Sequence, residues 1–134
     1  MRKTGYTLIE MLIAIGILSI LVLVATSLYT GYIRKGRRID AVNTLLSISL
    51  AEERYRSNNA QYGTLTQVWS GVATSAEGYY NISISNVSAS GYTVTATGQG
   101  GQASDAENGT SCTTLTLTVS SGTITKTPAV CWPT

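Results

Sequence analysis

Apolar side chains fill a long segment near the start of the chain. Met11 to Ile33 are 23 residues without a charged side chain, and most of them are Ile, Leu, Val or Ala. A helix needs about 20 such residues to cross the hydrocarbon core of a bilayer. A secretory signal peptide would have a shorter apolar core followed by a cleavage site of small residues, so the segment predicts a membrane-spanning helix instead.

A helical period continues after this segment. Side chains of one face recur at alternating steps of four and three residues at Ala41, Leu45, Ile48, Glu52 and Tyr55, with Val42, Leu46 and Leu50 alongside. A wide, largely apolar stripe of this kind docks on a sheet. The pattern predicts one helix from residue 6 to about residue 57, whose first half faces lipid and whose second half packs on protein.

Later in the chain the apolar positions alternate with a period of two residues. The alternation predicts strands at Tyr80–Ile84, Tyr92–Ala96 and Leu115–Val119, and a fourth around Ile124 after a turn at residues 120–122. Thr and Tyr are frequent in these segments and Gly and Ser separate them, which is typical of an antiparallel sheet with one buried face.

The segments between these elements are less regular. Ser57-Asn58-Asn59 ends the helix, residues 58–77 predict an irregular connection with short elements at best, and residues 98–111 predict a mobile surface loop. The early helical period and the late strand period together predict an α+β fold, in which a long N-terminal helix packs on a small antiparallel sheet of about four strands.

Basic residues flank the apolar segment on both sides. They are Arg2 and Lys3 before it, and Arg34, Lys35, Arg37 and Arg38 after it. The larger number after the segment favours a cytoplasmic location for the rest of the chain, by the positive-inside rule. Asp40 lies three residues after Arg37 and could pair with it, which would stabilise a solvated helix by about 0.2–0.5 kcal/mol.

Two cysteines near the end of the chain give the opposite indication. Cys112 and Cys131 have 18 residues between them, and such a pair in a small exported domain favours a disulfide over free thiols. A metal site would need two further ligands, and the chain has no histidine. A disulfide would stabilise the fold by about 3 kcal/mol and pin the end of the chain to the sheet.

The first ten residues decide between these orientations. They read Met1-Arg2-Lys3-Thr4-Gly5, then Tyr6-Thr7-Leu8-Ile9-Glu10, directly before the apolar segment. This resembles the type IV prepilin signature, which has a short basic leader ending in Gly, a large apolar or aromatic residue after it, and a Glu four residues further on. The resemblance implies that a prepilin peptidase cuts between Gly5 and Tyr6 and methylates the new amino terminus of Tyr6. It also implies that the C-terminal domain lies in the periplasm.

Glu10 is an acidic residue at the start of a membrane helix. A carboxylate costs about 2.5–3.5 kcal/mol at the bilayer centre and less near the interface, so such a residue is usually functional. Within the pilin resemblance we expect Glu10 to pair with the freed amine of Tyr6, in its own subunit or a neighbouring one, and so to set the axial register of a filament. The alternative is that its side chain only reaches the lipid headgroups.

The resemblance divides the chain into a leader (residues 1–5), a transmembrane and filament-core helix (6–33) and a periplasmic head (34–134). The leader would take Arg2 and Lys3 with it, so that nine basic and seven acidic residues become seven of each and the mature side chains carry no net charge. We expect the basic residues after the span to anchor at anionic lipid and to pair with acidic residues of neighbouring subunits.

The rest of the chain resembles PilE-like minor pilins of Gram-negative bacteria. The residues that carry this resemblance are Arg37-Arg38, Asp40-Ala41, Glu52 to Tyr55, Asn58, Tyr62, Gly78 to Tyr80, Cys112 to Leu117 and Cys131-Trp132. In that group the two cysteines close a C-terminal disulfide loop. Ser27 is a departure, because pilins often have a proline at this place that bends the membrane helix.

The resemblance implies a structural subunit of a type IV pilus, a minor pilin that acts in pilus assembly and so in adhesion, twitching motility or DNA uptake. It would be held in the inner membrane before assembly and become extracellular in the pilus. Its partners would be other pilins, the prepilin peptidase and the assembly platform of the inner membrane.

Three other classes of function compete with this one. A pseudopilin of type II secretion would share the leader and the helix, but the major form typically uses a calcium site rather than a C-terminal disulfide. A DNA-receptor pilin would need several Lys or Arg on one surface, and Lys126 is the only one after Arg56. An enzyme is not expected, because no nucleophile–base set or phosphate-binding glycine motif is visible, and no cofactor or metal is expected either.

Overall fold

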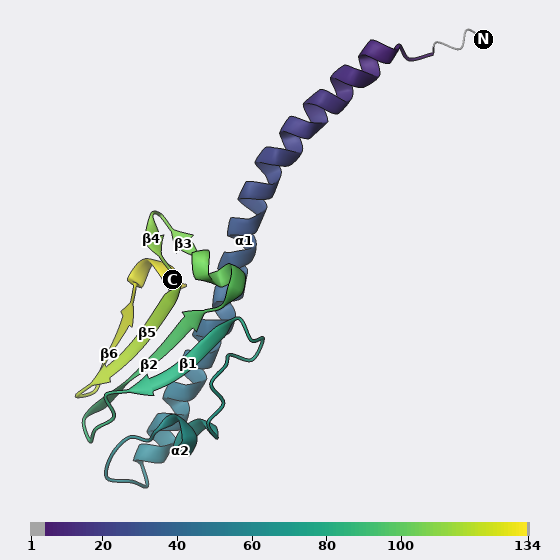
Figure 1. Cartoon of the computed structure of the whole chain (residues 1–134). Helices are drawn as coiled ribbons and strands as arrows, with labels where there is room; N and C mark the ends of the chain where they lie inside the picture. The colour runs from purple at the N-terminus through teal and green to yellow at the C-terminus, as the bar shows by residue number, and fades with distance from the viewer. Residues whose placement is uncertain (1–4, 134) are drawn as a thin grey trace. The chain divides into compact units, whose positions relative to one another are not determined.

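The computed structural model describes residues 5–133, apart from the side chains of Ser27 and Leu28, so the leader residues before Gly5 lie outside the described part. The chain divides into two units, Met1–Ile33 and Arg34–Thr134, and one helix, α1 (Leu8–Arg56), contributes to both (Figure 1). The predicted helix from residue 6 to about residue 57 is confirmed to within two residues at each end.

In the first unit, α1 has exposed apolar side chains and no proline that would interrupt it. Two of its hydroxyl groups find partners inside the helix: Ser19 donates to the carbonyl oxygen of Ile15 at 2.8 Å, and Thr26 donates to that of Leu23 at 3.1 Å. Internal partners of this kind suit a helix in lipid, because the bilayer core offers no others.

The second unit contains a four-stranded antiparallel sheet in the order β1-β2-β5-β6. The strands are β1 (Tyr80–Ser85), β2 (Gly91–Gly98), β5 (Thr114–Ser120) and β6 (Thr123–Thr127). The four predicted strands are therefore confirmed. Figure 1 shows that the sheet lies along the second half of α1.

One face of the sheet and one face of α1 form the core. Val94 and Leu117 are register partners on adjacent strands and are both buried. The helix contributes a stripe of fully buried side chains, Ala41, Leu45 and Ile48. Tyr92 adds a directional contact, since its hydroxyl group donates to Ser49 Oγ on α1 at 2.8 Å, and burial raises the pKa of Tyr92 to about 12.

The connection after α1 includes a short helix, α2 (Leu65–Trp69), which starts with a capping box of Thr64 and Gln67. Glu52 of α1 anchors this connection: it is completely buried, and its Oε2 accepts a hydrogen bond from the backbone N–H of Gly63 at 2.7 Å. Burial raises the pKa of the Glu52 carboxyl group, although the hydrogen bond from Gly63 acts in the opposite direction.

Residues 98–111 do not form a simple surface loop, so that prediction is wrong. They contain the 3-10 helix η1 (Gly100–Ser104) and the strands β3 (Ala106–Glu107) and β4 (Thr110–Ser111). Gln102 is completely buried, and its Nε2 donates to Tyr80 Oη at 2.8 Å and to the carbonyl oxygen of Arg34 at 3.1 Å. Buried polar contacts therefore hold this segment against both α1 and the sheet.

The strand β6 lies at an edge of the sheet, and all five of its residues are exposed. Lys126 is in this strand, with its Nζ 5.2 Å from the ring centroid of the buried Trp132. The turn η2 (Ala129–Cys131) follows and leads to Cys131, which forms the predicted disulfide with Cys112. The end of the chain is therefore covalently tied to the segment that precedes β5.

Candidate functional site

The residues of the predicted cleavage and assembly site lie at the start of α1. Gly5 and Tyr6 precede the helix and are exposed, Tyr6 by 81%. Glu10 lies in the first helical turn. In this uncleaved chain the nitrogen of Tyr6 is part of a peptide bond, so the pairing of Glu10 with a free amine stays a prediction.

Glu10 has a local role that was not predicted, although the sequence contains its signal. The backbone N–H of Glu10 donates to Thr7 Oγ1 at 3.3 Å, and the N–H of Thr7 donates to Glu10 Oε2 at 3.5 Å. Thr-x-x-Glu is the pattern of a capping box, and the helix dipole favours a carboxylate in the first turn. Both hydrogen bonds are long and exposed, so the carboxylate is free to exchange them for a stronger partner.

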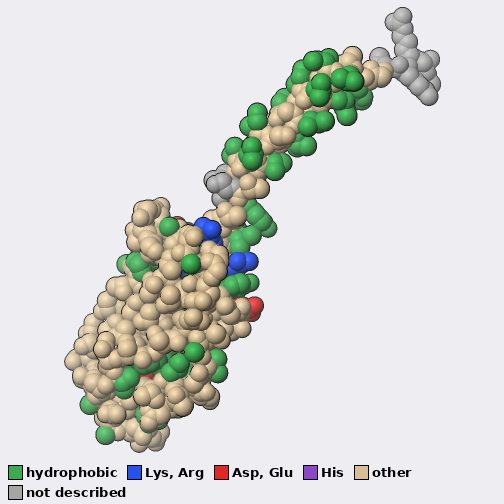
Figure 2. Space-filling model, in the orientation of Figure 1, with side chains coloured by type: hydrophobic (Ala, Val, Ile, Leu, Met, Phe, Trp, Pro, Cys, Tyr) green, Lys and Arg blue, Asp and Glu red, His purple; other side chains and the backbone are tan. Residues whose placement is uncertain are grey.

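The helix after Glu10 exposes an apolar surface. From Leu8 to Val24 the large apolar side chains are 52–79% exposed, and Figure 2 shows them covering this part of α1 on the face in view. By length and composition α1 is able to cross a membrane. Because a helix with apolar side chains on all sides is stable only when it is covered, this surface requires lipid or other helices.

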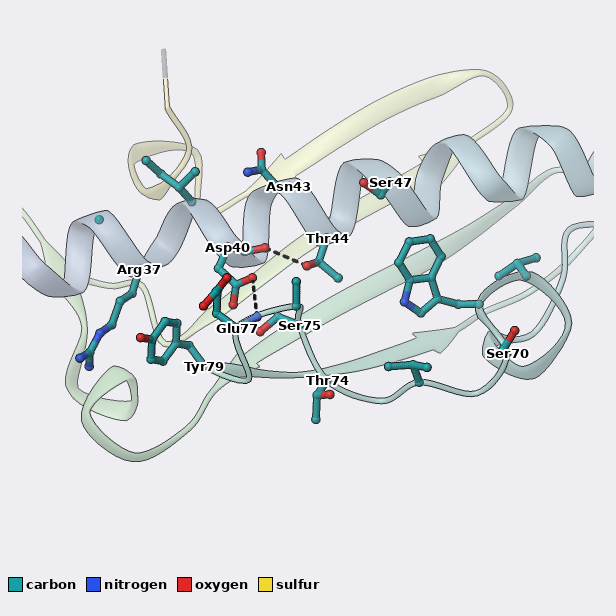
Figure 3. A pocket seen from close by; sticks show the side chains of 16 residues that line it. Arg37, Asp40, Asn43, Thr44, Ser47, Ser70, Thr74, Ser75, Glu77 and Tyr79 are labelled. Atoms are coloured by element: carbon teal, nitrogen blue, oxygen red, sulfur yellow. Dashed lines mark hydrogen bonds between the residues drawn. The ribbon is translucent and has the colours of Figure 1, made fainter.

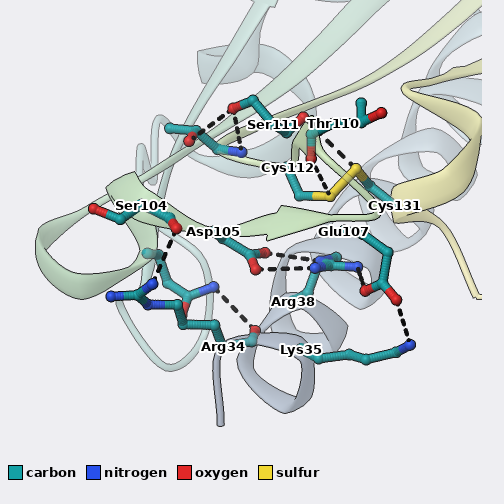
Figure 4. Close-up of polar contacts among 12 residues, drawn as sticks. Arg34, Lys35, Arg38, Ser104, Asp105, Glu107, Thr110, Ser111, Cys112 and Cys131 are labelled. Atoms are coloured by element: carbon teal, nitrogen blue, oxygen red, sulfur yellow. Dashed lines mark hydrogen bonds and ion pairs between the residues drawn. A yellow bond between two sulfur atoms is a disulfide. The ribbon is translucent and has the colours of Figure 1, made fainter. Parts of the chain in front are cut away.

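Two of the basic residues that follow this segment have acidic partners in their own chain (Figure 4). Arg38 is buried and forms a bidentate pair with Asp105, with N–O distances of 2.8 and 2.9 Å, and a further contact with Glu107 at 3.1 Å. Lys35 Nζ lies 2.9 Å from Glu107 Oε1. The hydrogen bond to Asp105 raises the pKa of Arg38, and the one from Lys35 lowers the pKa of Glu107. The expectation that these two residues would pair with neighbouring subunits is corrected.

The other two basic residues, Arg34 and Arg37, have different partners. Arg34 Nη1 donates to the carbonyl oxygen of Ser104 at 3.0 Å. The guanidinium group of Arg37 lies over the ring of Tyr79, 4.5 Å from its centroid. Within residues 5–133, neither of the two has a carboxylate oxygen within 4.0 Å.

An open groove of about 1090 Å³ lies between α1 and residues 68–79 (Figure 3). Asp40 lines it: its Oδ1 accepts the backbone N–H of Glu77 at 3.2 Å, and its Oδ2 has no hydrogen-bond partner among the described residues. The predicted pair of Asp40 with Arg37 is therefore wrong. In the described part of the chain no three His, Cys, Asp or Glu side chains come together in a way that could hold a metal ion.

The long apolar helix with an acid in its first turn, joined to a disulfide-closed α+β head, defines the pilin class of protein. Residues 1–26 match the prokaryotic N-terminal methylation motif, and residues 27–116 match the family described as type IV minor pilin ComP, DNA uptake sequence receptor. Since the second match spans about two thirds of the chain, the protein belongs to this family of type IV minor pilins. No match was found among curated proteins.

Membership in this family confirms the predicted fold and the predicted role as a minor subunit of a type IV pilus. As a type IV pilin, the protein is anchored in a membrane by its apolar helix, has a leader that a peptidase processes, and assembles with other pilins.

Proposed function

We propose that this minor pilin helps to prime or join the pilus, and that it enters the filament through the first half of α1. The uncharged helix from Met11 to Ile33, whose side chains are exposed from Met11 to Thr26, carries this proposal. Its surface is covered by inner-membrane lipid before assembly and by the corresponding helices of other subunits afterwards. The role is structural rather than catalytic, and the assembly platform of the inner membrane is the partner that transfers the subunit from one environment to the other.

Processing creates the assembly site in this proposal. A prepilin peptidase removes residues 1–5 after Gly5 and methylates the amine of Tyr6, and Glu10 then pairs with that amine or with the amine of an adjacent subunit. The long, exposed capping contacts of Glu10 support this role, because little is lost when they are exchanged for an ion pair. The head, residues 34–134, lies in the periplasm, and the disulfide of Cys112 with Cys131 suits that oxidising compartment.

Sheared filaments test the proposal. Wild type and Glu10→Ala are produced at equal levels, and mass spectrometry quantifies each in the filament fraction against the dominant subunit. We expect wild type at a small fraction of the dominant subunit with a methylated Tyr6, strong loss of Glu10→Ala, and normal incorporation of Glu53→Ala, which removes an exposed acid of the head.

Three results would contradict parts of the proposal. Incorporation of Glu10→Ala at the wild-type level would remove the assembly role of Glu10, and a mature chain that keeps residues 1–5 would remove the whole mechanism. A ratio near unity to the dominant subunit would contradict a minor role. Absence from pili with presence in a secretion apparatus would favour the pseudopilin alternative.

DNA binding is a second candidate function, because the description of the matching family includes a DNA uptake sequence receptor. Besides the partly buried Arg34, Arg37 and Arg56, the described head offers two exposed cations that have no carboxylate partner among the described residues, Arg54 and Lys126. Fluorescence anisotropy with duplex DNA at several salt concentrations tests this function. A receptor should lose affinity steeply with salt, and Arg54→Gln or Lys126→Gln should each lower the slope by about 1. Binding that is absent at low salt would reject this candidate.

A further inference from the structure

Of the four basic residues that follow the apolar segment, two are neutralised by acidic partners and two, Arg34 and Arg37, carry the remaining positive charge. Lys35 and Arg38 share the carboxylates of Asp105 and Glu107, which neutralise them. Arg34 and Arg37 have no such partner among the described residues, so their charge stays uncompensated there. Figure 4 shows that Arg34 extends toward Ser104 while Lys35 extends toward Glu107, so the uncompensated charge lies apart from the neutralised one.

The uncompensated pair is held in position rather than free in solvent. Both side chains are partly buried. Arg34 donates to the carbonyl oxygen of Ser104, and the guanidinium carbon of Arg37 lies over the ring of Tyr79. Both also approach η1, because Ser104 ends this turn and a Cβ atom on Gly101 would come within 4.0 Å of Arg37 Nη1. Since Arg34 and Arg37 are three residues apart on a helix, they are surface neighbours.

The contacts that position these side chains leave most of their donors available. A guanidinium group has five N–H donors in one plane. Arg34 uses a single donor in its hydrogen bond to Ser104, and the side chain of Arg37, with its Cζ 4.5 Å from the centroid of the Tyr79 ring, donates no hydrogen bond to any of the described residues. Two planar guanidinium groups that are already ordered match the oxygens of a phosphate group, and they lose little conformational entropy when they bind it.

We propose that Arg34 and Arg37 together bind the phosphate of an anionic phospholipid headgroup while the subunit is held in the membrane. Arg34 directly follows Ile33, the last residue of the uncharged segment, so the pair belongs to the part of the chain that meets the interface. Two guanidinium groups match the single phosphate of one headgroup, whereas a DNA duplex is bound through many phosphates. The site concerns the subunit before assembly, so its failure would leave the proposed filament role intact.

Lipid selectivity of the full, processed chain tests the site. The protein is reconstituted in vesicles of equimolar phosphatidylethanolamine and phosphatidylglycerol, released in mild detergent, and its retained lipids are counted by native mass spectrometry. We expect enrichment of phosphatidylglycerol, a loss of about fivefold for Arg34→Gln or for Arg37→Gln, and a loss near the product of the two in the double variant.

Lys35→Gln is the matched control, because it removes one charge next to Arg34 but from a side chain that Glu107 already neutralises. It should keep the enrichment, and an unchanged denaturation midpoint should show that each variant folds. Equal retention of the two lipids by wild type, or an equal loss in Lys35→Gln, would overturn the proposal. Inorganic phosphate or duplex DNA that binds through both arginines, without lipid enrichment, would overturn it in favour of that ligand.

Discussion

The two halves of α1 form one continuous helix but solve the problem of covering apolar surface in different ways. In the first half, from Leu8 to Val24, the large apolar side chains are all at least 52% exposed. In the second half, Leu45 is completely buried while its neighbour Leu46 is 43% exposed. The apolar side chains of the first half must be covered by other molecules, whereas those of the second half pack on the sheet of the same chain. The contacts that cover the apolar side chains can therefore be exchanged in the first half of α1, whereas in the second half they are permanent.

Charged groups follow the same division. Arg38 and Glu52, both buried in the second half, find partners within the chain, at Asp105 and at the backbone of Gly63. Among residues 5–133, the contacts of Glu10, the acid of the first half, are long, exposed and within its own helical turn. Partners built into the chain indicate a structure that is complete in the monomer. For Glu10, the lack of a strong partner among the described residues supports the proposal that it gains its partner on assembly.

The largest expected effect comes from removing a charge of the second half. Arg38→Met should lower the free energy of unfolding of the head by about 3–5 kcal/mol, because Asp105 would stay buried without its partner. Denaturant unfolding of the full chain in detergent, followed by tryptophan fluorescence, measures it. Lys35→Met is the control and should have a much smaller effect, because its pair with Glu107 is exposed. Equal effects would show that burial of Arg38 does not matter.

Two adjacent leucines lie on different faces of the second half of α1, Leu45 on the buried face and Leu46 on the exposed face. Leu45→Ala should destabilise the head by about 2–5 kcal/mol through the cavity it leaves. Leu46→Ala should change the unfolding free energy by no more than about 0.5 kcal/mol. The same denaturation experiment compares them. If both variants were equally destabilised, α1 would not present the single buried face described above.

A charge in the first half should act on membrane insertion and not on the head. Val22→Lys lies near the middle of the uncharged segment and should raise the apparent free energy of insertion by about 2.5–3.5 kcal/mol. A translocon insertion assay measures this, and Val22→Ala is the matched control. The unfolding of the head should stay as in wild type; a loss of head stability would mean that the two halves depend on each other.

The smallest effect is expected for Glu52, and it should appear as a change in pH dependence. Burial raises the pKa of this carboxyl group in the folded state, so its contribution to stability is present below the ordinary value of 4.5 and is lost as the pH rises through the raised value. Glu52→Gln removes that loss, and its stability relative to wild type should therefore increase with pH. Unfolding at a series of pH values measures this difference.

Glu53→Gln is the control for this pH series, because it changes an exposed acid next to Glu52. It should keep most of the pH dependence of wild type. A Glu52→Gln variant that tracks wild type at every pH would show that the folded head holds Glu52 ionised without cost.

Hydrophobic periodicity was sufficient to predict the long helix and the four-stranded sheet, but not the short elements between them. The ends of α1, the four strands of the sheet and the disulfide all follow from local pattern and composition. The capping box of Thr7 and Glu10 was also readable in the sequence as Thr-x-x-Glu, although it was not predicted. Each of these features depends on residues close together in the chain or on a single pair of cysteines.

The buried polar contacts could not be predicted in the same way. Gln102 and Asp105 lie in a segment rich in Gly, Ser and Asn, which is typical of a surface loop. Their partners on α1 are 68 and 67 positions away, at Arg34 and Arg38. A run of basic residues after an apolar segment gives no local sign that Arg38 turns inward, so only the tertiary fold separates it from Arg34.

The charge of Lys126 on the edge strand β6 affects how closely packed heads can contact one another. The strand β6 leaves one row of backbone N–H and C=O groups open at the border of the sheet, and a second sheet could join there and continue indefinitely. A cationic side chain within such a border opposes this fusion, because two borders brought together would each bring a like charge. The charge of Lys126 therefore disfavours the joining of neighbouring heads through their β6 edges.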